Sequence, residues 1–244
     1  MQANIHKEMA YQVIADYPNP HLLEYLLEGV AKPKWNKDQA TKIRWLKEWM
    51  DRPDNKHHSS KQKNDHSYKL TKTEKGFKIK FIGNRADQAT VVARLKYAAR
   101  DIREWKIEEE PRVAALELAK SIHWVIDFST PPHTIADWDD KLHGKVEKDF
   151  DKMWKTFYNR AKMDFTSENH IKDIYRWAKA FIEEKYSRGC YLLEIYKSGG
   201  SMKDGRGQQL GREVILDVAQ NLADYLVYLN RLINYDKMLK SLSL

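Results

Sequence analysis

Cysteine and long apolar runs are what this sequence has least of. Cys190 is its single cysteine, so an intrachain disulfide is impossible and a thiolate could supply at most one ligand to a metal ion. No apolar run approaches the ~20 residues of a membrane-spanning helix, and no basic segment followed by an apolar one marks a signal peptide. Internal repeats and long low-complexity linkers are also missing. The sequence therefore predicts one domain over 1–244 with no transmembrane segment.

An excess of acidic residues is missing as well. Lys and Arg number 43 against 35 Asp and Glu, which gives a formal net charge of +8. Such a surface attracts anionic partners, whether nucleic acids, phosphate esters or acidic membranes. The same excess of lysine would also keep a helical protein soluble, so the charge alone names no partner.

Helical periodicity, by contrast, covers most of the chain. The expected helices span 1–15, 20–31, 36–50, 86–106, 112–128, 141–163, 167–185 and 208–239. A polar loop occupies 51–66, and 68–82 alternates apolar and polar residues about Gly76, which is typical of a β-hairpin. We therefore expect an all-α fold, a single-domain bundle of many helices with a small hairpin after the loop.

One stretch carries residues that bind metals at helical spacing. His123 and Asp127 lie four apart, as do His143 and Glu147, and His133 follows a Pro-Pro break between the two pairs. Side chains four apart stand on one face of a helix, so each pair can converge on a single ion. Either pair alone is explained by a solvated polar face or a helix ion pair. Two pairs with a histidine between them favour a metal site.

The neighbours of the first pair strengthen this interpretation. His123 and Asp127 lie at the border of a stripe that should face the core. The apolar residues of that stripe are Leu116, Ala119, Ile122, Val125 and Ile126. A buried charge without a partner is costly, so an imidazole and a carboxylate at this position must be paired or ligated. A divalent metal ion would satisfy both.

The ligand-type residues follow one another in an order that resembles a known family. In chain order they are His6, Asp54, His66, His123, Asp127, His133, His143 and Glu147. With the aromatic Tyr68 after the loop histidine, this order resembles the zinc-dependent phospholipase C and P1-type nuclease superfamily. The resemblance spans 1–147 in motif and the whole chain in length and helical character. It implies an all-α bundle that hydrolyses phosphodiester bonds with up to three zinc ions.

The resemblance also implies a metal for each residue. One zinc would take Asp54, His66, His123 and Asp127. The second would take His133, His143 and Glu147. The third would take His6, a bridging oxygen of Asp127, and the amine and carbonyl of Met1.

One of these residues, Asp54, is also a candidate for a catalytic role. Asp54 is the candidate to orient or deprotonate the attacking water, and it can equally be a plain ligand. No separate nucleophile is needed, so Ser129 and Thr130, which adjoin the site, are expected to end the helix instead.

This chain departs from the family's pattern at its first residue, and its loop offers more than one histidine as the ligand. Family members begin, after removal of a signal peptide, with a tryptophan whose amine is a ligand, whereas this chain begins with Met1, which could supply the same groups. We expect a secreted protein if Met1 replaces a removed signal peptide, and a cytoplasmic one if Met1 is the native start. In the loop, His57 or His58 could replace His66 as the ligand, and we prefer His66 for its neighbour Tyr68.

Three functions are compatible with these residues. A phospholipase C-like enzyme is favoured by the short interval between His133 and His143, by Glu rather than Asp at Glu147, and by the lack of disulfides. A P1-type nuclease of single strands is favoured by the net charge and by aromatic residues on which bases could stack. The third is a non-catalytic, metal-stabilised helical protein. We rank the phospholipase slightly above the nuclease.

The substrate classes make different demands on the loop. Asn55 and Lys56 follow the loop aspartate, where the family's phosphocholine-binding enzyme has a tyrosine, and a lysine there would repel choline. We therefore expect little activity on phosphatidylcholine. For a nucleic acid, the lysines near the loop could form a basic track for the backbone; they are Lys56, Lys61, Lys63, Lys69 and Lys72. We further expect a monomer whose contact with anionic membranes is peripheral.

Overall fold

The computed structural model of the protein describes residues 4–16, 68–81, 111–133, 140–158, 163–165, 171 and 173–242. The helices expected over 20–31, 36–50 and 86–106, and the polar loop 51–66, lie outside the described residues. Within the described part the fold is all-α, as predicted, with the small hairpin as its one sheet. No described helix is both long enough and apolar enough to cross a membrane.

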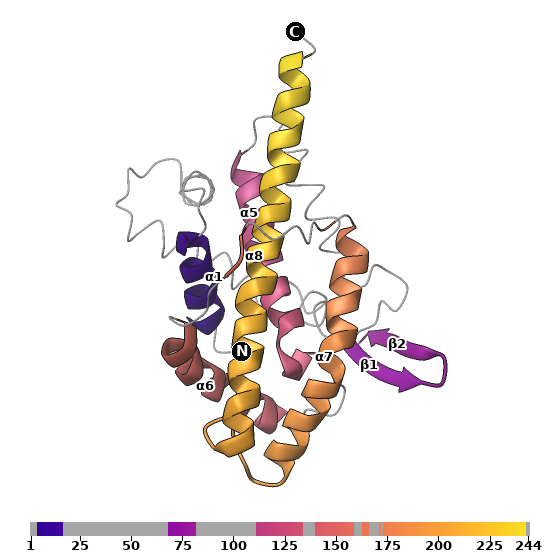
Figure 1. Ribbon diagram of the computed structural model, residues 1–244, viewed down its shortest axis with the longest axis vertical. Coiled ribbons are helices and arrows are strands. Elements are labelled where there is room, and N and C mark those ends of the chain that lie inside the picture. The colour runs from indigo at the N-terminus through magenta and orange to yellow at the C-terminus, as the bar shows by residue number, and fades with distance from the viewer. Residues whose placement is uncertain are drawn as a thin grey trace.

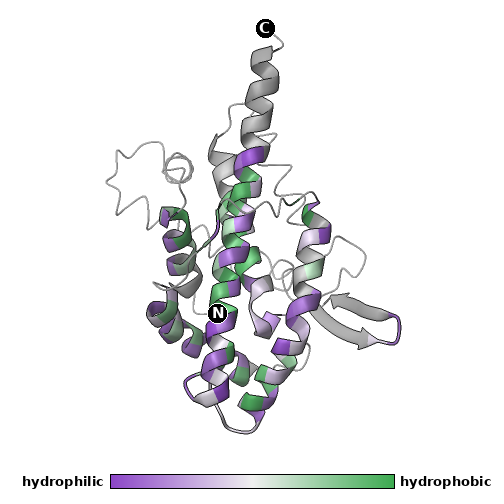
Figure 2. Ribbon diagram, in the orientation of Figure 1, coloured by the Kyte–Doolittle hydropathy of each residue, from purple (hydrophilic) through white to green (hydrophobic). Residues whose placement is uncertain are grey.

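The other described helices pack around α8 (Gly205–Leu242), which runs along the long axis of the molecule (Figure 1). The four that contact it are α1 (Asn4–Asp16), α5 (Pro111–Ser129), α6 (Asp140–Phe157) and α7 (Ile174–Lys197). Apolar residues recur along α8 between polar ones (Figure 2). Its buried residues include Val218, Leu222, Ala223, Leu226 and Leu229. These residues form an apolar stripe that faces the core, and Leu216 is half-buried at its edge.

α5 keeps the limits that its sequence predicts. Pro111 occupies the first helical position, where its missing N–H costs nothing. The helix ends where the hydroxyl of Ser129 donates to the carbonyl oxygen of Val125 at 2.8 Å and that of Thr130 donates to Asp127 O at 3.0 Å. These two side chains therefore end the helix, as expected.

α7 differs from its prediction at both ends. Asp173 rather than Ser167 caps its first turn, since Asp173 Oδ1 accepts the backbone N–H of Arg176 at 3.1 Å. At the other end the helix continues past Lys185 and through Gly189 to Lys197. A glycine within a helix costs about 1 kcal/mol relative to alanine, and burial of the apolar residues beyond it offsets that cost. The predicted limits 167–185 are therefore wrong.

α6 begins as predicted but stops before Met163. It ends at Phe157, and the chain at Met163 and Asp164 is no longer helical. Tyr158, just past the helix, stacks on Trp154 at 4.6 Å between ring centroids and donates its hydroxyl hydrogen to Asp16 Oδ2 at 2.5 Å. This contact with α1 is non-local, and periodicity does not encode it.

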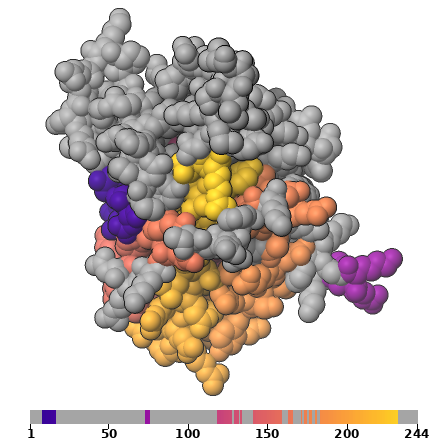
Figure 3. Space-filling model, turned by 45° about the horizontal axis from the view of Figure 1, so that its top comes forward, coloured from indigo at the N-terminus to yellow at the C-terminus, as the bar shows by residue number. Residues whose placement is uncertain are grey.

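The predicted hairpin is confirmed. β1 (Tyr68–Thr73) and β2 (Gly76–Phe81) pair antiparallel, with Tyr68 opposite Phe81. The turn lies at Glu74 and Lys75, so Gly76 begins the second strand instead of marking the turn. The exposed turn projects away from the helices in two views (Figures 1 and 3).

Candidate metal centre

Three elements bring the histidines and carboxylates of the motif to one place. α5 carries His123 and Asp127 on successive turns, and α6 carries His143 and Glu147 in the same way. Between them the 3₁₀ turn η2 (Pro131–His133) presents His133, held by a hydrogen bond from its backbone N–H to Thr130 O at 3.2 Å. Proline cannot continue the hydrogen-bond ladder of α5, so the chain turns at this point.

The α5 pair is buried in the helical core. His123 Nε2 lies 3.1 Å from Asp127 Oδ2, and both side chains are 1% exposed. The other oxygen of the carboxylate, Oδ1, lies 3.4 Å from His133 Nε2. Asp127 therefore stands between two imidazoles, one from its own helix and one from the turn that follows.

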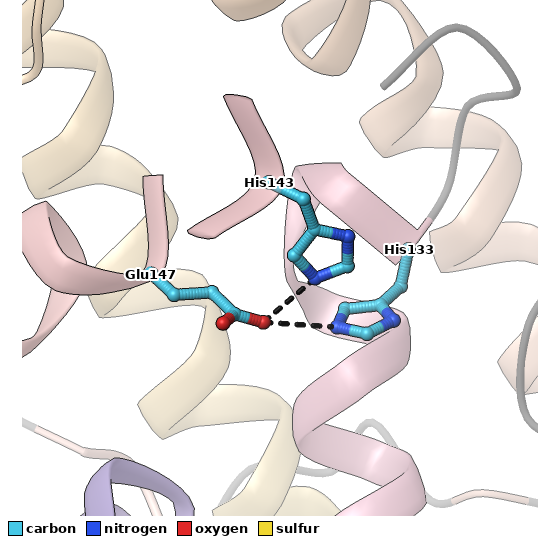
Figure 4. A group of neighbouring side chains, drawn as sticks. All are labelled: His133, His143 and Glu147. Carbon is cyan, nitrogen blue, oxygen red and sulfur yellow. Dashed lines mark hydrogen bonds and ion pairs between the residues drawn. The ribbon is translucent and has the colours of Figure 1, made fainter. Parts of the chain in front are cut away.

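The α6 pair closes the cluster from the other side (Figure 4). His143 Nε2 lies 2.6 Å from Glu147 Oε1, and His133 Nε2 lies 3.9 Å from the same oxygen. The rings of His133 and His143 meet edge to face, with centroids 4.7 Å apart. His133 is thus the residue that both pairs share.

Glu147 is ionised at neutral pH despite its burial. Burial works to raise the pKa of its carboxyl, but the hydrogen bond and charge of His143, with the charge of His133, outweigh burial and hold the pKa below the usual 4.5. A carboxylate in this state is ready to bind a cation.

The arrangement fits a metal ion. One ligand atom each from His133, His143 and Glu147 lies within 4.8 Å of the other two. Two ligands about 2.1 Å from a tetrahedral zinc ion stand about 3.4 Å apart, and the distances in the cluster lie on both sides of that value. Imidazole and carboxylate are the donors of open zinc sites. These three residues could therefore hold a metal ion.

The side chains of the remaining predicted ligands lie outside the part of the chain that the structure describes. Met1, Asp54 and His66 lie outside the described residues, as do His57 and His58. His6 belongs to the described backbone of α1, although its side chain is not described. α1 packs against α5, the helix that carries the first pair.

Two contacts around the cluster were not foreseen from the sequence. Asn221 of α8 donates to the hydroxyl of Ser129 at 3.1 Å and so ties the end of α5 to the central helix. On α6, Asp149 accepts a hydrogen bond from Tyr196 of α7. Both contacts join residues far apart in sequence, and periodicity does not encode either of them.

Comparison with solved structures finds the same fold in two clostridial toxins. The alpha-toxin of Clostridium perfringens, from an avian strain, matches with a TM-score of 0.55 and 15% identity over 94% of this chain and 63% of the toxin. The alpha toxin of Clostridium absonum matches with a TM-score of 0.56 and 15% identity over 96% of this chain and 65% of the toxin. The chain thus spans less than two thirds of either toxin. No protein-family model and no curated protein sequence matches it.

Proposed function

We propose that this protein hydrolyses phosphodiester bonds at a zinc centre, in the manner of a phospholipase C. The observation that carries the proposal is the convergence of His133, His143 and Glu147, with Asp127 adjoining them through His133. This convergence is what the ligand order in the sequence implies. The fold shared with two alpha-toxins agrees with the helical bundle implied by the same order.

The proposed ligand sets follow the resemblance. The first zinc would take Asp54, His66, His123 and Asp127, the second would take His133, His143 and Glu147, and the third would take His6, Asp127 and the amine and carbonyl of Met1. The two oxygens of Asp127 face histidines assigned to different ions. These contacts bring Asp127 beside the second set as well as the first, whereas its bridge to the third ion is inferred from the resemblance alone.

The chemistry assigns separate tasks to the protein's residues. Zinc held by these residues would polarise the phosphoryl oxygens and make a nearby water more acidic. Burial of His123 and Asp127 keeps their side chains in one orientation, and ionised Glu147 supplies negative charge without a change of protonation. Asp54 would take a proton from the water that attacks phosphorus, while the bond from phosphorus to the leaving oxygen breaks and that oxygen receives a proton from solvent. No covalent intermediate forms on the protein.

The substrate in this proposal is a phospholipid at an anionic membrane surface. A single-stranded nucleic acid is the second candidate, favoured by the +8 charge and by the lysines in and near the hairpin. Both are phosphodiesters, and the same metal centre could act on either.

Parallel assays distinguish the candidates. Purified protein would be given phosphatidylcholine, an anionic phospholipid and single-stranded DNA, each before and after EDTA and after zinc is restored. We expect zinc-dependent turnover of the phospholipids, weakest on phosphatidylcholine. Faster turnover of DNA than of any lipid would make the protein a nuclease, and bound zinc without turnover of any substrate would make the metal structural.

A further inference from the structure

α6 carries two pairs of polar residues that alternate along the same stretch of helix. His143 and Glu147 lie four residues apart, and so do Lys145 and Asp149. Each residue turns an α-helix by about 100°, so the second pair lies about 200° around the helix from the first. One face of α6 therefore serves the metal centre while the opposite face meets another part of the protein.

The end of α7 and the loop after it, residues 198–204, hold that opposite face. Asp149 is 3% exposed, and the hydroxyl of Tyr196 donates to its Oδ2 at 2.8 Å. Lys203 places Nζ 2.8 Å from the other carboxylate oxygen, Oδ1. Both oxygens of the buried carboxylate thus have partners outside α6.

Lys145 adds an attachment one turn earlier. Its Nζ donates to the carbonyl oxygen of Gly200 at 3.2 Å and lies 5.2 Å from the centroid of the Tyr196 ring. The hydroxyl oxygen of Tyr196 in turn accepts the backbone N–H of Met202 at 3.2 Å. The α6 latch, as we call this group, consists of Lys145, Asp149, Tyr196 and Lys203.

The loop is itself closely packed. A Cβ added at Gly207 would stand 2.1 Å from the carbonyl oxygen of Ser201, so the two backbone segments touch. The hydroxyl of Ser201 donates to Asp204 Oδ2 at 2.9 Å and accepts the N–H of Lys203 at 3.1 Å. The loop is therefore a fixed support against which α6 can be oriented.

The orientation of α6 matters to the metal centre because metal ligands tolerate little displacement. Side-chain tips lie about 5–6 Å from a helix axis, so a rotation of about 10° moves them by about 1 Å. Metal–ligand distances stay within about 0.2 Å of their preferred values. A small rotation of α6 would therefore carry His143 and Glu147 out of reach of an ion held by His133.

We propose that Asp149 and Tyr196 are positioning residues for the metal centre. By fixing the rotation of α6 about its axis, they hold His143 and Glu147 toward His133. The inference rests on the proposed zinc centre. It gives the α6 latch a role beyond stability, because removing one of its hydrogen bonds should change zinc affinity. None of the contacts described above joins the latch to the three ligands.

Tyr158 offers a matched control. Like Tyr196 it is a buried tyrosine whose hydroxyl donates to an aspartate of another helix, here Asp16 at the end of α1. Its bond lies beyond the end of α6, away from the face opposite the metal centre. Tyr158→Phe and Tyr196→Phe remove the same atom, so they separate lost stability from lost positioning.

The test measures zinc affinity by competition with a chelator, on folded wild-type protein and on three variants. Tyr196→Phe and Asp149→Asn should each weaken the tighter zinc sites by about 10–100-fold, the effect typical of residues that orient metal ligands. Tyr158→Phe should lower the melting temperature by a similar amount and leave zinc affinity within about twofold of wild type. The absorption spectrum of the cobalt-substituted Tyr196→Phe protein should also change.

Lys203→Ala keeps the inference testable if the buried variants do not fold, because Lys203 is an exposed side chain. It should weaken zinc binding by a smaller factor and leave folding intact. Unchanged zinc affinity and an unchanged cobalt spectrum in folded Tyr196→Phe or Lys203→Ala would overturn the positioning role alone. Wild-type protein that binds no zinc would overturn the proposed function and the latch together.

Discussion

Two groups of ion pairs in the described part of the bundle, one around the buried Lys185 and one at the candidate metal centre, differ in the partners that their carboxylates have. Between α7 and α8, Lys185 places Nζ 2.8 Å from Asp217 Oδ2 and 2.9 Å from Glu184 Oε1, and Arg188 pairs with the same oxygen of Asp217. We call these four residues the α7–α8 ion pairs. The metal-centre cluster instead joins two carboxylates to imidazoles; its members are His123, Asp127, His133, His143 and Glu147.

This difference indicates that the α7–α8 ion pairs are structural and that the metal-centre cluster binds a ligand. In the α7–α8 ion pairs two basic side chains face two acidic ones, so each has a partner of opposite sign within the protein. In the metal-centre cluster the partners of the carboxylates are imidazoles, and imidazole and carboxylate together are the donors of open zinc sites. A cation could therefore bind between them. The comparison predicts that a bound metal ion contacts the metal-centre cluster and leaves the α7–α8 ion pairs unchanged.

The largest expected effect comes from replacing one aspartate in each group. Asp127→Asn should lower kcat/KM by at least about 10³-fold and weaken zinc binding by more than the about 10–100-fold expected of residues that merely orient ligands. Asp217→Asn should leave both unchanged. Steady-state kinetics and zinc titration of the two variants provide the test. Equal losses in the two variants would erase the distinction between the groups.

Metal removal should have the next largest effect. At zinc concentrations 100-fold above Kd, binding stabilises the folded state by about 2.7 kcal/mol, which corresponds to about 5–10 °C in Tm for a chain of this length. EDTA should therefore lower the Tm of wild-type protein and of Asp217→Asn by this amount. It should lower the Tm of Asp127→Asn by less, because only the second set keeps all its ligands in that variant. A wild-type Tm that is insensitive to EDTA would count against a zinc centre.

The α7–α8 ion pairs should respond to apolar replacement as structural pairs do. Asp217→Asn leaves Lys185 buried with fewer partners and should cost about 1–3 kcal/mol of unfolding free energy, less than a fully buried pair because Asp217 is 27% exposed. The double variant Lys185→Met with Asp217→Leu should recover most of that loss. Urea unfolding gives the values, and a double variant less stable than Asp217→Asn would contradict this account.

A pH titration of zinc-free protein should give the smallest effect. Burial, with a nearby aspartate, raises the pKa of Tyr158 and of Tyr196 far above the usual 10.0. Below pH 10 both are neutral, folded or unfolded; above it the unfolded chain ionises first, so stability falls as pH rises. The loss should approach about 1 kcal/mol per tyrosine at pH 11. In each Tyr→Phe variant the free energy of unfolding should fall less steeply with pH than in wild type. The same slope in variant and wild type would show that these phenols ionise freely.

The sequence predicted well what depends on local spacing. The pairs at 123/127 and 143/147 could be predicted once the helices were placed correctly, because residues four apart on a helix lie on the same face. Pro131 and Pro132 ensured a break that left His133 between the pairs. The start of α5 at Pro111 and its end at Ser129 were also local, because a proline and two hydroxyls determine them.

What the sequence did not predict depends on contacts between distant residues. α7 continues through Gly189 because the residues beyond it are buried against the rest of the bundle, and burial of that kind leaves no local signal. The bond from Tyr196 to Asp149 joins two helices that no motif connects. The roles of Asp54, His66 and Met1 stay predictions, because these residues lie outside the described part of the chain.

An anomalous difference map from crystals of the protein, collected at the zinc absorption edge, tests the central claim most directly. We predict a peak about 2.0–2.2 Å from a nitrogen of His133, a nitrogen of His143 and an oxygen of Glu147, with a neighbouring peak beside Asp127. A map from zinc-supplemented crystals with no peak at these residues, and with the imidazoles still paired to their carboxylates, would contradict it.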